Sequence, residues 1–122
     1  MIRAFRLFTG TDGHSHVERG SMINHEIIAT GTIHFEETPA HSSLDWHNAP
    51  TVQYVITLAG VLEFTMHSGE TFTVRSGEIL IALDTTGTGH KWRLTNDEPW
   101  KRGYVSFKET PKLNFQPDAS AA

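Results

Sequence analysis

The sequence predicts an all-β sandwich or barrel, and three observations predict it. Period-two alternation of apolar and polar residues recurs along the chain, whereas the periodicity of amphipathic helices is weak. The alternating runs are short, and turns that contain glycine separate them, as in the stretch from His67 to Glu70. No strand-like run is followed by a long amphipathic helix, which disfavours a βαβ fold.

Each predicted strand follows from its own alternation. Ile2–Phe8 begins the series and leads into a turn-rich segment, residues 10–20, which is predicted to be a loop. In Glu26–Glu36 the β-branched residues put Ile33 and its apolar neighbours on one face and His34 on the other. The remaining predicted strands are Thr51–Leu58, Val61–Met66, Thr71–Arg75, Glu78–Leu83, His90–Leu94 and Arg102–Lys108.

Length and composition favour one cytoplasmic domain of ordinary globular type. A chain of 122 residues can bury one core, and we expect the domain to span residues 1–115, with a flexible tail at 116–122. The net charge of −4, without a cluster of Lys and Arg, argues against nucleic acid as a partner. No apolar run is long enough to suggest a membrane span, and the absence of cysteine excludes disulfides and thiolate sites.

Two histidines are candidates for a functional site because strand parity can turn both toward the interior. Residues of equal parity share one face of a strand. If the strand Thr51–Leu58 extends back toward His47, then His47 and Gln53 share a face. His90 likewise shares a face with Trp92. A barrel that turns both faces inward would gather two imidazoles and an amide oxygen, donors that could hold a divalent metal.

The segments around these residues resemble the two signature motifs of the cupin family, which are small β-barrels. The residues that match motif positions are His47, Gln53 and Gly60 in the first motif, at about 45–60, and Gly77 and His90 in the second, at about 77–94. The stretch LDTTGTGH resembles a group of short bacterial single-domain cupins. The resemblance implies a jelly-roll-like barrel of antiparallel strands.

The departures from the family pattern bear on the metal more than on the fold. Ala49 stands where the second histidine of the first motif belongs, and Gln53 replaces a carboxylate whose charge would help to hold a cation. His90 comes two residues late, which preserves its parity. The other consensus positions that differ are occupied by His41, Leu83, Thr88 and Leu94.

The resemblance implies a small-molecule enzyme, with His47 and His90 as its catalytic residues, in a homodimer. With Fe, Mn, Ni or Zn held by His47, Gln53 and His90, it would perform oxygenase, isomerase, cyclase or lyase chemistry. Without metal, one histidine would move a proton. A non-catalytic, metal-free binding protein is the alternative, and no nucleotide cofactor is expected. The residues expected to form the pocket around the two histidines are His34, Ala49, Gln53, Asp84 and Trp92.

Four polar residues have a competing interpretation. His14 and His16 imitate a metal motif, but in a loop bounded by glycines they are expected to be exposed to solvent. His34 either lines the pocket or lies on the outer face, and the pattern alone favours the outer face. Asp84 either caps the loop before His90 or orients His90 at the pocket rim.

Overall fold

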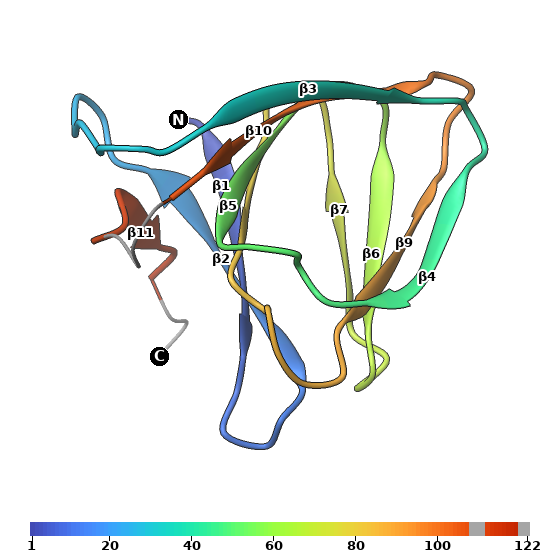
Figure 1. Cartoon of the computed structure of the whole chain (residues 1–122), viewed down its shortest axis with the longest axis horizontal. Helices are drawn as coiled ribbons and strands as arrows, with labels where there is room; N and C mark the ends of the chain where they lie inside the picture. Colours follow the sequence, from blue (N-terminus) through green and yellow to red (C-terminus); the bar gives the residue numbers. More distant parts are fainter. Residues whose placement is uncertain (108–111, 120–122) are drawn as a thin grey trace.

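The protein consists of two β-sheets that face each other (Figure 1). The structure is a computed structural model that describes residues 1–107 and 112–119, and within them it contains strands and no helix. The seven-stranded sheet contains, in spatial order, β11 (Phe115–Pro117), β2 (Ser15–Met22), β1 (Arg3–Thr9), β8 (Ile79–Ala82), β5 (Gln53–Ala59), β10 (Trp100–Ser106) and β3 (Ile33–Thr38). The four-stranded sheet contains β4 (Ser43–His47), β9 (His90–Leu94), β6 (Leu62–Met66) and β7 (Thr71–Val74).

This arrangement confirms the predicted all-β, jelly-roll-like class and corrects two of its details. The sheets form an open sandwich rather than a closed barrel, because β3 and β4 lie at separate sheet edges with a cavity between their side chains. The strands pair antiparallel except β1 with β8, which run parallel, with Ala4 opposite Ile79. That pair joins the first strand of the chain to the eighth.

One half of the space between the sheets is filled by aromatic rings. Phe5 of the seven-stranded sheet stacks on Phe72 of the four-stranded sheet at 5.1 Å between ring centroids, and Phe72 stacks on Phe64 at 5.0 Å. Leu7 and Leu62 beside them are fully buried. Burial of large apolar side chains is the main favourable term in folding, so this half holds the sheets together.

The seven-stranded sheet is also covered on its outer face. Tyr54 and Ile81 there pack with Phe107, and Leu113 and Phe115 lie against them. Phe115 continues into β11, which pairs with β2, so residues 116 and 117 belong to a sheet rather than to the expected tail. The small, polar residues of the tail predicted flexibility, but the apolar contacts of Phe115 and the pairing of β11 with β2 hold residues 116 and 117 in the sheet. Residues 120–122 of the tail, and residue 108 of the last predicted strand, lie outside the described residues.

The sequence patterns did not predict two strands near the candidate histidines. The predicted loop at residues 10–20 contains most of β2, because its pairing with β1 compensates for a weak local pattern. The predicted backward extension of Thr51–Leu58 was also wrong, since His47 ends β4, and β5 begins only at Gln53. His47 and Gln53 therefore lie in different sheets.

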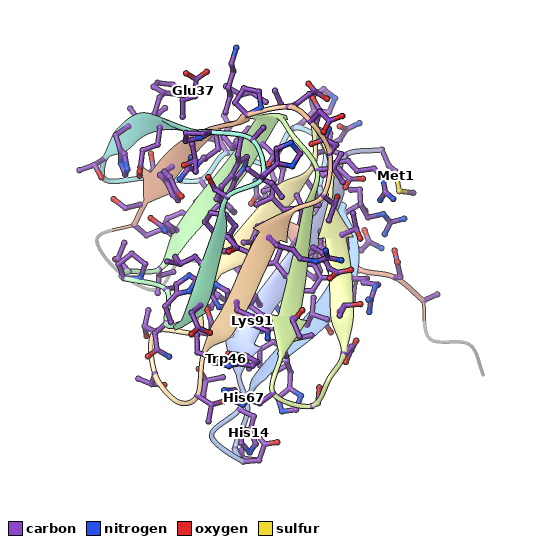
Figure 2. The ribbon with its side chains drawn as sticks, turned by 90° about the vertical axis from the view of Figure 1, so that its right-hand side faces the viewer. Met1, His14, Glu37, Trp46, His67 and Lys91 are labelled. Carbon is purple, nitrogen blue, oxygen red and sulfur yellow. The ribbon has the colours of Figure 1, made fainter. Side chains whose placement is uncertain are left out.

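Strand alternation places neighbours of the histidines outside the sandwich. Trp46 and Lys91 lie on the outer face of the four-stranded sheet, where the Trp46 ring stacks on His67 at 3.6 Å (Figure 2). In β9 the buried residues alternate with exposed ones, as predicted for His90, Trp92 and Leu94. No helix in the described part of the chain is long and apolar enough to cross a membrane.

Candidate active site

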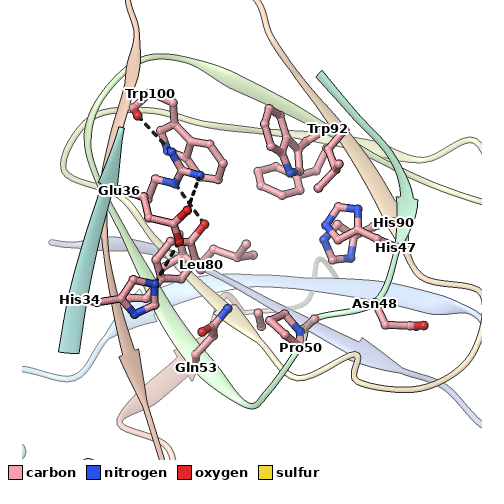
Figure 3. Close-up of a pocket in the computed structure, with 17 residues that line it drawn as sticks. His34, Glu36, His47, Asn48, Pro50, Gln53, Leu80, His90, Trp92 and Trp100 are labelled. Atoms are coloured by element: carbon pink, nitrogen blue, oxygen red, sulfur yellow. Dashed lines mark hydrogen bonds and ion pairs between the residues drawn. The ribbon is translucent and has the colours of Figure 1, made fainter. Parts of the chain in front are cut away.

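The other half of the space between the sheets is a cavity of about 400 Å³ (Figure 3). Its volume lies at the lower end of the range found for sites that bind small molecules. Apolar side chains of both sheets form its walls, and a few polar groups project into it. The lining residues used below are His34, Glu36, His47, Ala49, Gln53, Val55, Leu80, Ala82, His90, Trp92, Trp100, Arg102 and Tyr104.

The cavity brings together the two histidines that the sequence singled out. In the pairing of β4 with β9, His47 lies opposite His90, and their ring centroids are 4.4 Å apart. Gly89, with φ of +74°, precedes His90, and a Cβ there would collide with the backbone carbonyl of His47. Only glycine permits this close approach and this backbone angle together. The loop before β9 thus sets the position of His90.

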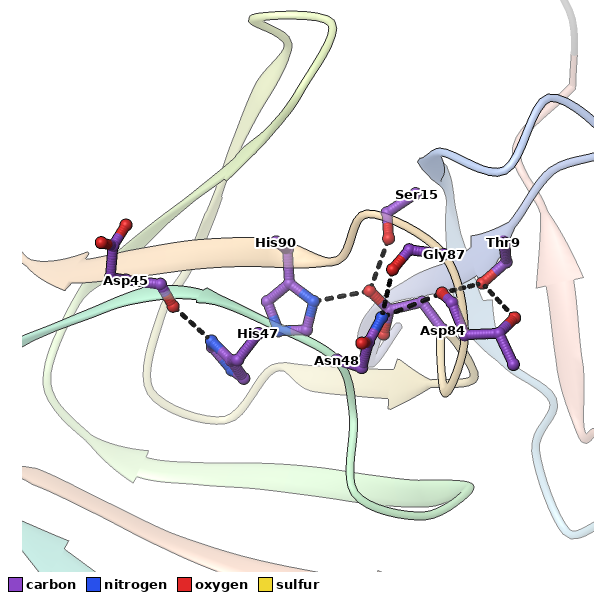
Figure 4. Close-up of polar contacts among 9 residues, drawn as sticks. Thr9, Ser15, Asp45, His47, Asn48, Asp84, Gly87 and His90 are labelled. Atoms are coloured by element: carbon purple, nitrogen blue, oxygen red, sulfur yellow. Dashed lines mark hydrogen bonds and ion pairs between the residues drawn. The ribbon is translucent and has the colours of Figure 1, made fainter.

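A buried carboxylate holds His90 from behind (Figure 4). Asp84 Oδ2 lies 2.6 Å from His90 Nδ1 and accepts a hydrogen bond from Ser15 Oγ, also at 2.6 Å. Asp84 is fully buried and does not line the cavity, so it lies behind the rim at which we expected it. A carboxylate oxygen without a hydrogen only accepts, so with Oδ2 as the acceptor the hydrogen on this ring lies on Nδ1.

The opposite ring nitrogen of His90 is free to act in the cavity. Nε2 forms no hydrogen bond within residues 1–107 and 112–119. Among the described residues, only one side-chain nitrogen or oxygen is both closed to solvent and without a hydrogen bond, and that atom is Asp84 Oδ1. Since Nε2 of His90 also lacks a hydrogen bond, it is open to solvent. Nε2 of His90 therefore keeps access to the cavity that its ring lines. With the proton on Nδ1, Nε2 carries a lone pair that can accept another.

His47 is oriented in the same way by a backbone group. Its Nδ1 donates to the carbonyl oxygen of Asp45 at 2.8 Å, which leaves Nε2 unprotonated in the neutral ring. Partial burial lowers the pKa of His47 below its usual 6.5, and the positive charge that His90 can carry lowers it further. His47 is thus a neutral imidazole near pH 7, next to His90.

Three further predicted pocket residues lie where the sequence placed them, on the cavity wall. Gln53 is buried, and its side-chain amide makes no hydrogen bond to any residue that the structure describes, so it can serve a ligand. Trp92 packs edge-on against Trp100 at 4.8 Å and forms part of the apolar wall. Ala49 leaves space beside His47 that a larger side chain would fill.

The far end of the cavity holds a polar cluster of which the sequence analysis predicted only His34. His34 lines this end although its side chain is more than half exposed, and it bonds Glu36 through Nε2 at 3.0 Å. Arg102 of β10 is buried beside Glu36, and its guanidinium lies 3.9 Å from the centre of the Trp100 ring. Strand parity could have revealed this cluster, because Arg102 and Tyr104 lie two residues apart and therefore share one face of a predicted strand.

The donors present do not fit a resident catalytic metal. Catalytic zinc and iron sites use three protein ligands, and iron sites commonly include a carboxylate. Here His47 and His90 meet, but no group of three or more imidazoles, thiols and carboxylates with metal-site geometry occurs in residues 1–107 and 112–119. Asp84 is sealed behind His90, and Glu36 bonds His34. The metal role of His47, Gln53 and His90 stays a prediction.

Comparison with known proteins adds likenesses of fold only. No protein-family model and no curated protein matches the sequence. A Neisseria meningitidis protein is 13% identical over 70% of this chain and 86% of its own, with a TM-score of 0.47. A Streptococcus pyogenes protein of unknown function is 21% identical over 73% and 81%, with a TM-score of 0.45.

A third similar structure is an ethanolamine utilization protein Q of Salmonella typhimurium. It is 14% identical over 88% of this chain and 96% of its own, with a TM-score of 0.41. Such low identities and TM-scores assign neither a family nor a function to this chain. The two-sheet, jelly-roll-like fold is consistent with the cupin resemblance, which no family model confirms.

Proposed function

We propose that this protein is a small-molecule enzyme that moves a proton at a carbon next to a carbonyl group, with His90 as general base. The buried pair of Asp84 and His90 carries the proposal. A carboxylate on Nδ1 fixes the tautomer that leaves Nε2 free to accept a proton, and it stabilises the imidazolium that forms. A histidine needed only for packing would not require a sealed acidic partner.

The proton transfer needs no further reactant. The lone pair of His90 Nε2 forms a bond to the hydrogen, and the carbon–hydrogen bond of the substrate breaks. Its electron pair becomes a carbon–carbon double bond, while the carbonyl π electrons move onto the oxygen. The imidazolium then returns the same proton to the enolate oxygen, which gives the enol, or, where a carbon–carbon double bond is conjugated with the enolate, to the far end of that double bond. The result is an isomerisation, and loss of a leaving group from the enolate would give an elimination.

Two neighbouring side chains support this chemistry. The buried amide of Gln53 has hydrogens to donate to the oxygen on which charge develops, which stabilises the enolate. Neutral His47 contacts His90 and adds no positive charge that would oppose protonation of His90. Apolar side chains such as Leu80 and Trp92 lower the polarity around the reacting atoms, which strengthens these interactions.

The proposal is tested by hydrogen exchange in heavy water. The protein is incubated with pyruvate, phenylpyruvate, their amides and acetone, and proton NMR follows replacement of hydrogen by deuterium beside the carbonyl. We expect exchange above the buffer rate with at least one compound. His90→Ala should lower that rate by about 100-fold or more, the usual contribution of a general base.

The matched control is His16→Ala, which removes a partly exposed histidine that does not line the cavity and should leave the rate unchanged. Treatment with a chelator should also leave it unchanged, and a loss restored by Fe, Mn, Ni or Zn would contradict the metal-free route. Binding of a panel compound without any exchange would reject the enzyme in favour of the non-catalytic alternative. No exchange and no binding across the panel would reject the carbonyl substrate class.

A further inference from the structure

Arg102 is a buried cation that the proton transfer does not use. Its guanidinium is fixed on one side by three hydrogen bonds: Nε donates to the Tyr104 hydroxyl at 3.0 Å, and Nη1 donates to Thr38 Oγ1 at 2.6 Å and to the Trp100 carbonyl at 3.2 Å. The Trp100 ring lies beneath it at 3.9 Å. These contacts hold the group rigidly beside Trp100 and Glu36, which lie at the end of the cavity opposite the histidines (Figure 3).

The remaining nitrogen of Arg102 has no matching partner. Nη2 makes no hydrogen bond to a residue that the structure describes, and its nearest carboxylate oxygen, Glu36 Oε1, is 3.7 Å away. A structural Arg–carboxylate pair is usually bidentate, with both contacts shorter than 3 Å. The Arg102 side chain is only 6% exposed, whereas that of Glu36 is 50% exposed and bonds His34 instead. Glu36 therefore partly offsets the positive charge of Arg102, but it does not accept a hydrogen bond from Nη2.

The adjacent hydroxyl offers a second donor. Tyr104 accepts from Arg102 Nε, and its own hydrogen has no acceptor among the described residues. Burial raises the pKa of Tyr104 above its usual value of 10, so the hydroxyl stays protonated near neutral pH. Nη2 and the Tyr104 hydroxyl together present two donors to one planar acceptor. A carboxylate has the matching pair of oxygens.

We propose that Arg102 and Tyr104 bind a carboxylate of the substrate, so that the substrate is a small carbonyl-containing monocarboxylic acid. This inference rests on the proposed function, because it places the acid at one end of the cavity and the enolisable carbon at the other, beside His90. A monoanion suits the site better than a phosphate dianion, since Arg102 is the one cation lining the described cavity and Glu36 lies next to it.

The apolar walls between the two ends determine the rest of the molecule. Val55, Leu80 and Ala82 line the middle of the cavity, and Trp92 closes one side. A cavity of about 400 Å³ has room for a compact acid with an apolar body. Two polar ends and an apolar middle favour a keto acid over a sugar, whose hydroxyls would be left without partners along these walls.

The test compares each keto acid with its uncharged amide. In the wild type, pyruvate or phenylpyruvate should exchange hydrogen faster than its amide by about 10- to 100-fold, the usual worth of hydrogen bonds to a charged group. Arg102→Met should abolish this preference while exchange of the amide persists. Arg93→Met, which removes an exposed arginine on the outer face, is the matched control. Acetylphosphonate, a dianionic analogue, should compete weakly.

A second variant covers the case in which Arg102→Met does not fold. Glu36→Gln removes the competing carboxylate and should increase exchange of the acid but not of the amide. Equal exchange of acid and amide by the wild type would overturn the carboxylate site and leave the proton-transfer function intact. If nothing exchanges, NMR titration decides: binding of the acid but not the amide, lost in Arg102→Met, supports the site without the reaction, and equal or absent binding overturns it.

Discussion

The two halves of the space lie between the same two sheets and have different roles. In one half, Phe5, Phe72 and Phe64 stack in a continuous column, and no polar group interrupts it. In the other half, the same sheets carry His90 and Arg102 toward a cavity. Phe64 is the boundary, because it stacks on Phe72 and its ring centroid is 5.8 Å from that of His90.

The difference shows how a small sandwich can carry a polar site. Buried polar groups cost free energy unless they are paired, and a cavity forfeits packing contacts. The aromatic half offsets both costs, and this allows the other half to keep Asp84 buried and Nε2 of His90 unpaired. A substitution in the packed half should therefore lower the free energy of unfolding, whereas a substitution in the cavity half should lower the exchange rate.

The largest expected effect comes from the packed half. Phe72→Ala removes the middle ring of the column and should lower the free energy of unfolding by about 4 kcal/mol, since the cavity left behind cannot fully collapse. Urea denaturation measures this loss. The exchange rate per folded molecule should change little. Phe35→Ala, at an exposed ring, is the control, and an equal loss there would contradict the assignment of the core.

The next effect comes from the carboxylate behind His90. Asp84→Asn keeps the shape of the side chain but removes the charge that stabilises the imidazolium, so exchange should fall by about 100-fold. Heavy-water NMR measures it, with Asp97→Asn at an exposed carboxylate as the control. An undiminished rate would show that Asp84 is only a structural partner of Ser15 and His90.

The smallest expected effect is the response of the cavity half to acid. Burial lowers the pKa of His47 in the folded state, so between that value and 6.5 the unfolded chain binds more protons at this position. The stability contributed by neutral His47 is therefore present above pH 6.5 and lost as the pH falls through that window. Urea denaturation at pH 7, 6 and 5 should show a steeper loss for wild type than for His47→Gln. Identical slopes would contradict the burial of this ring.

Local alternation was enough to predict most of the central strands. β9 repeats its buried and exposed positions along all five residues, and the runs that became β5 to β8 have glycine-bearing turns between them. β2 and β4 were missed because their sequences lack clear alternation, and partners distant in the sequence make them strands. Long-range pairing of this kind leaves no local pattern to read.

The site was predicted in part and for a partly mistaken reason. His47 and His90 do meet, yet through pairing of β4 with β9 rather than through an extension of β5. The acid–base pair of Asp84 and His90 was one of two alternatives for Asp84. Arg102 was missed because a charged residue on a strand is usually solvated, and only the inward parity shared with Tyr104 argued otherwise.

The parallel pair of β1 and β8 has a consequence for synthesis on the ribosome. Residue 4 faces residue 79, so the first strand emerges long before its partner exists, while its other edge can pair with β2 almost at once. Until the chain has grown past residue 82, one side of β1 offers unsatisfied backbone amides and carbonyls to any passing strand. We expect nascent chains that stop short of this length to need a chaperone more than the finished protein does.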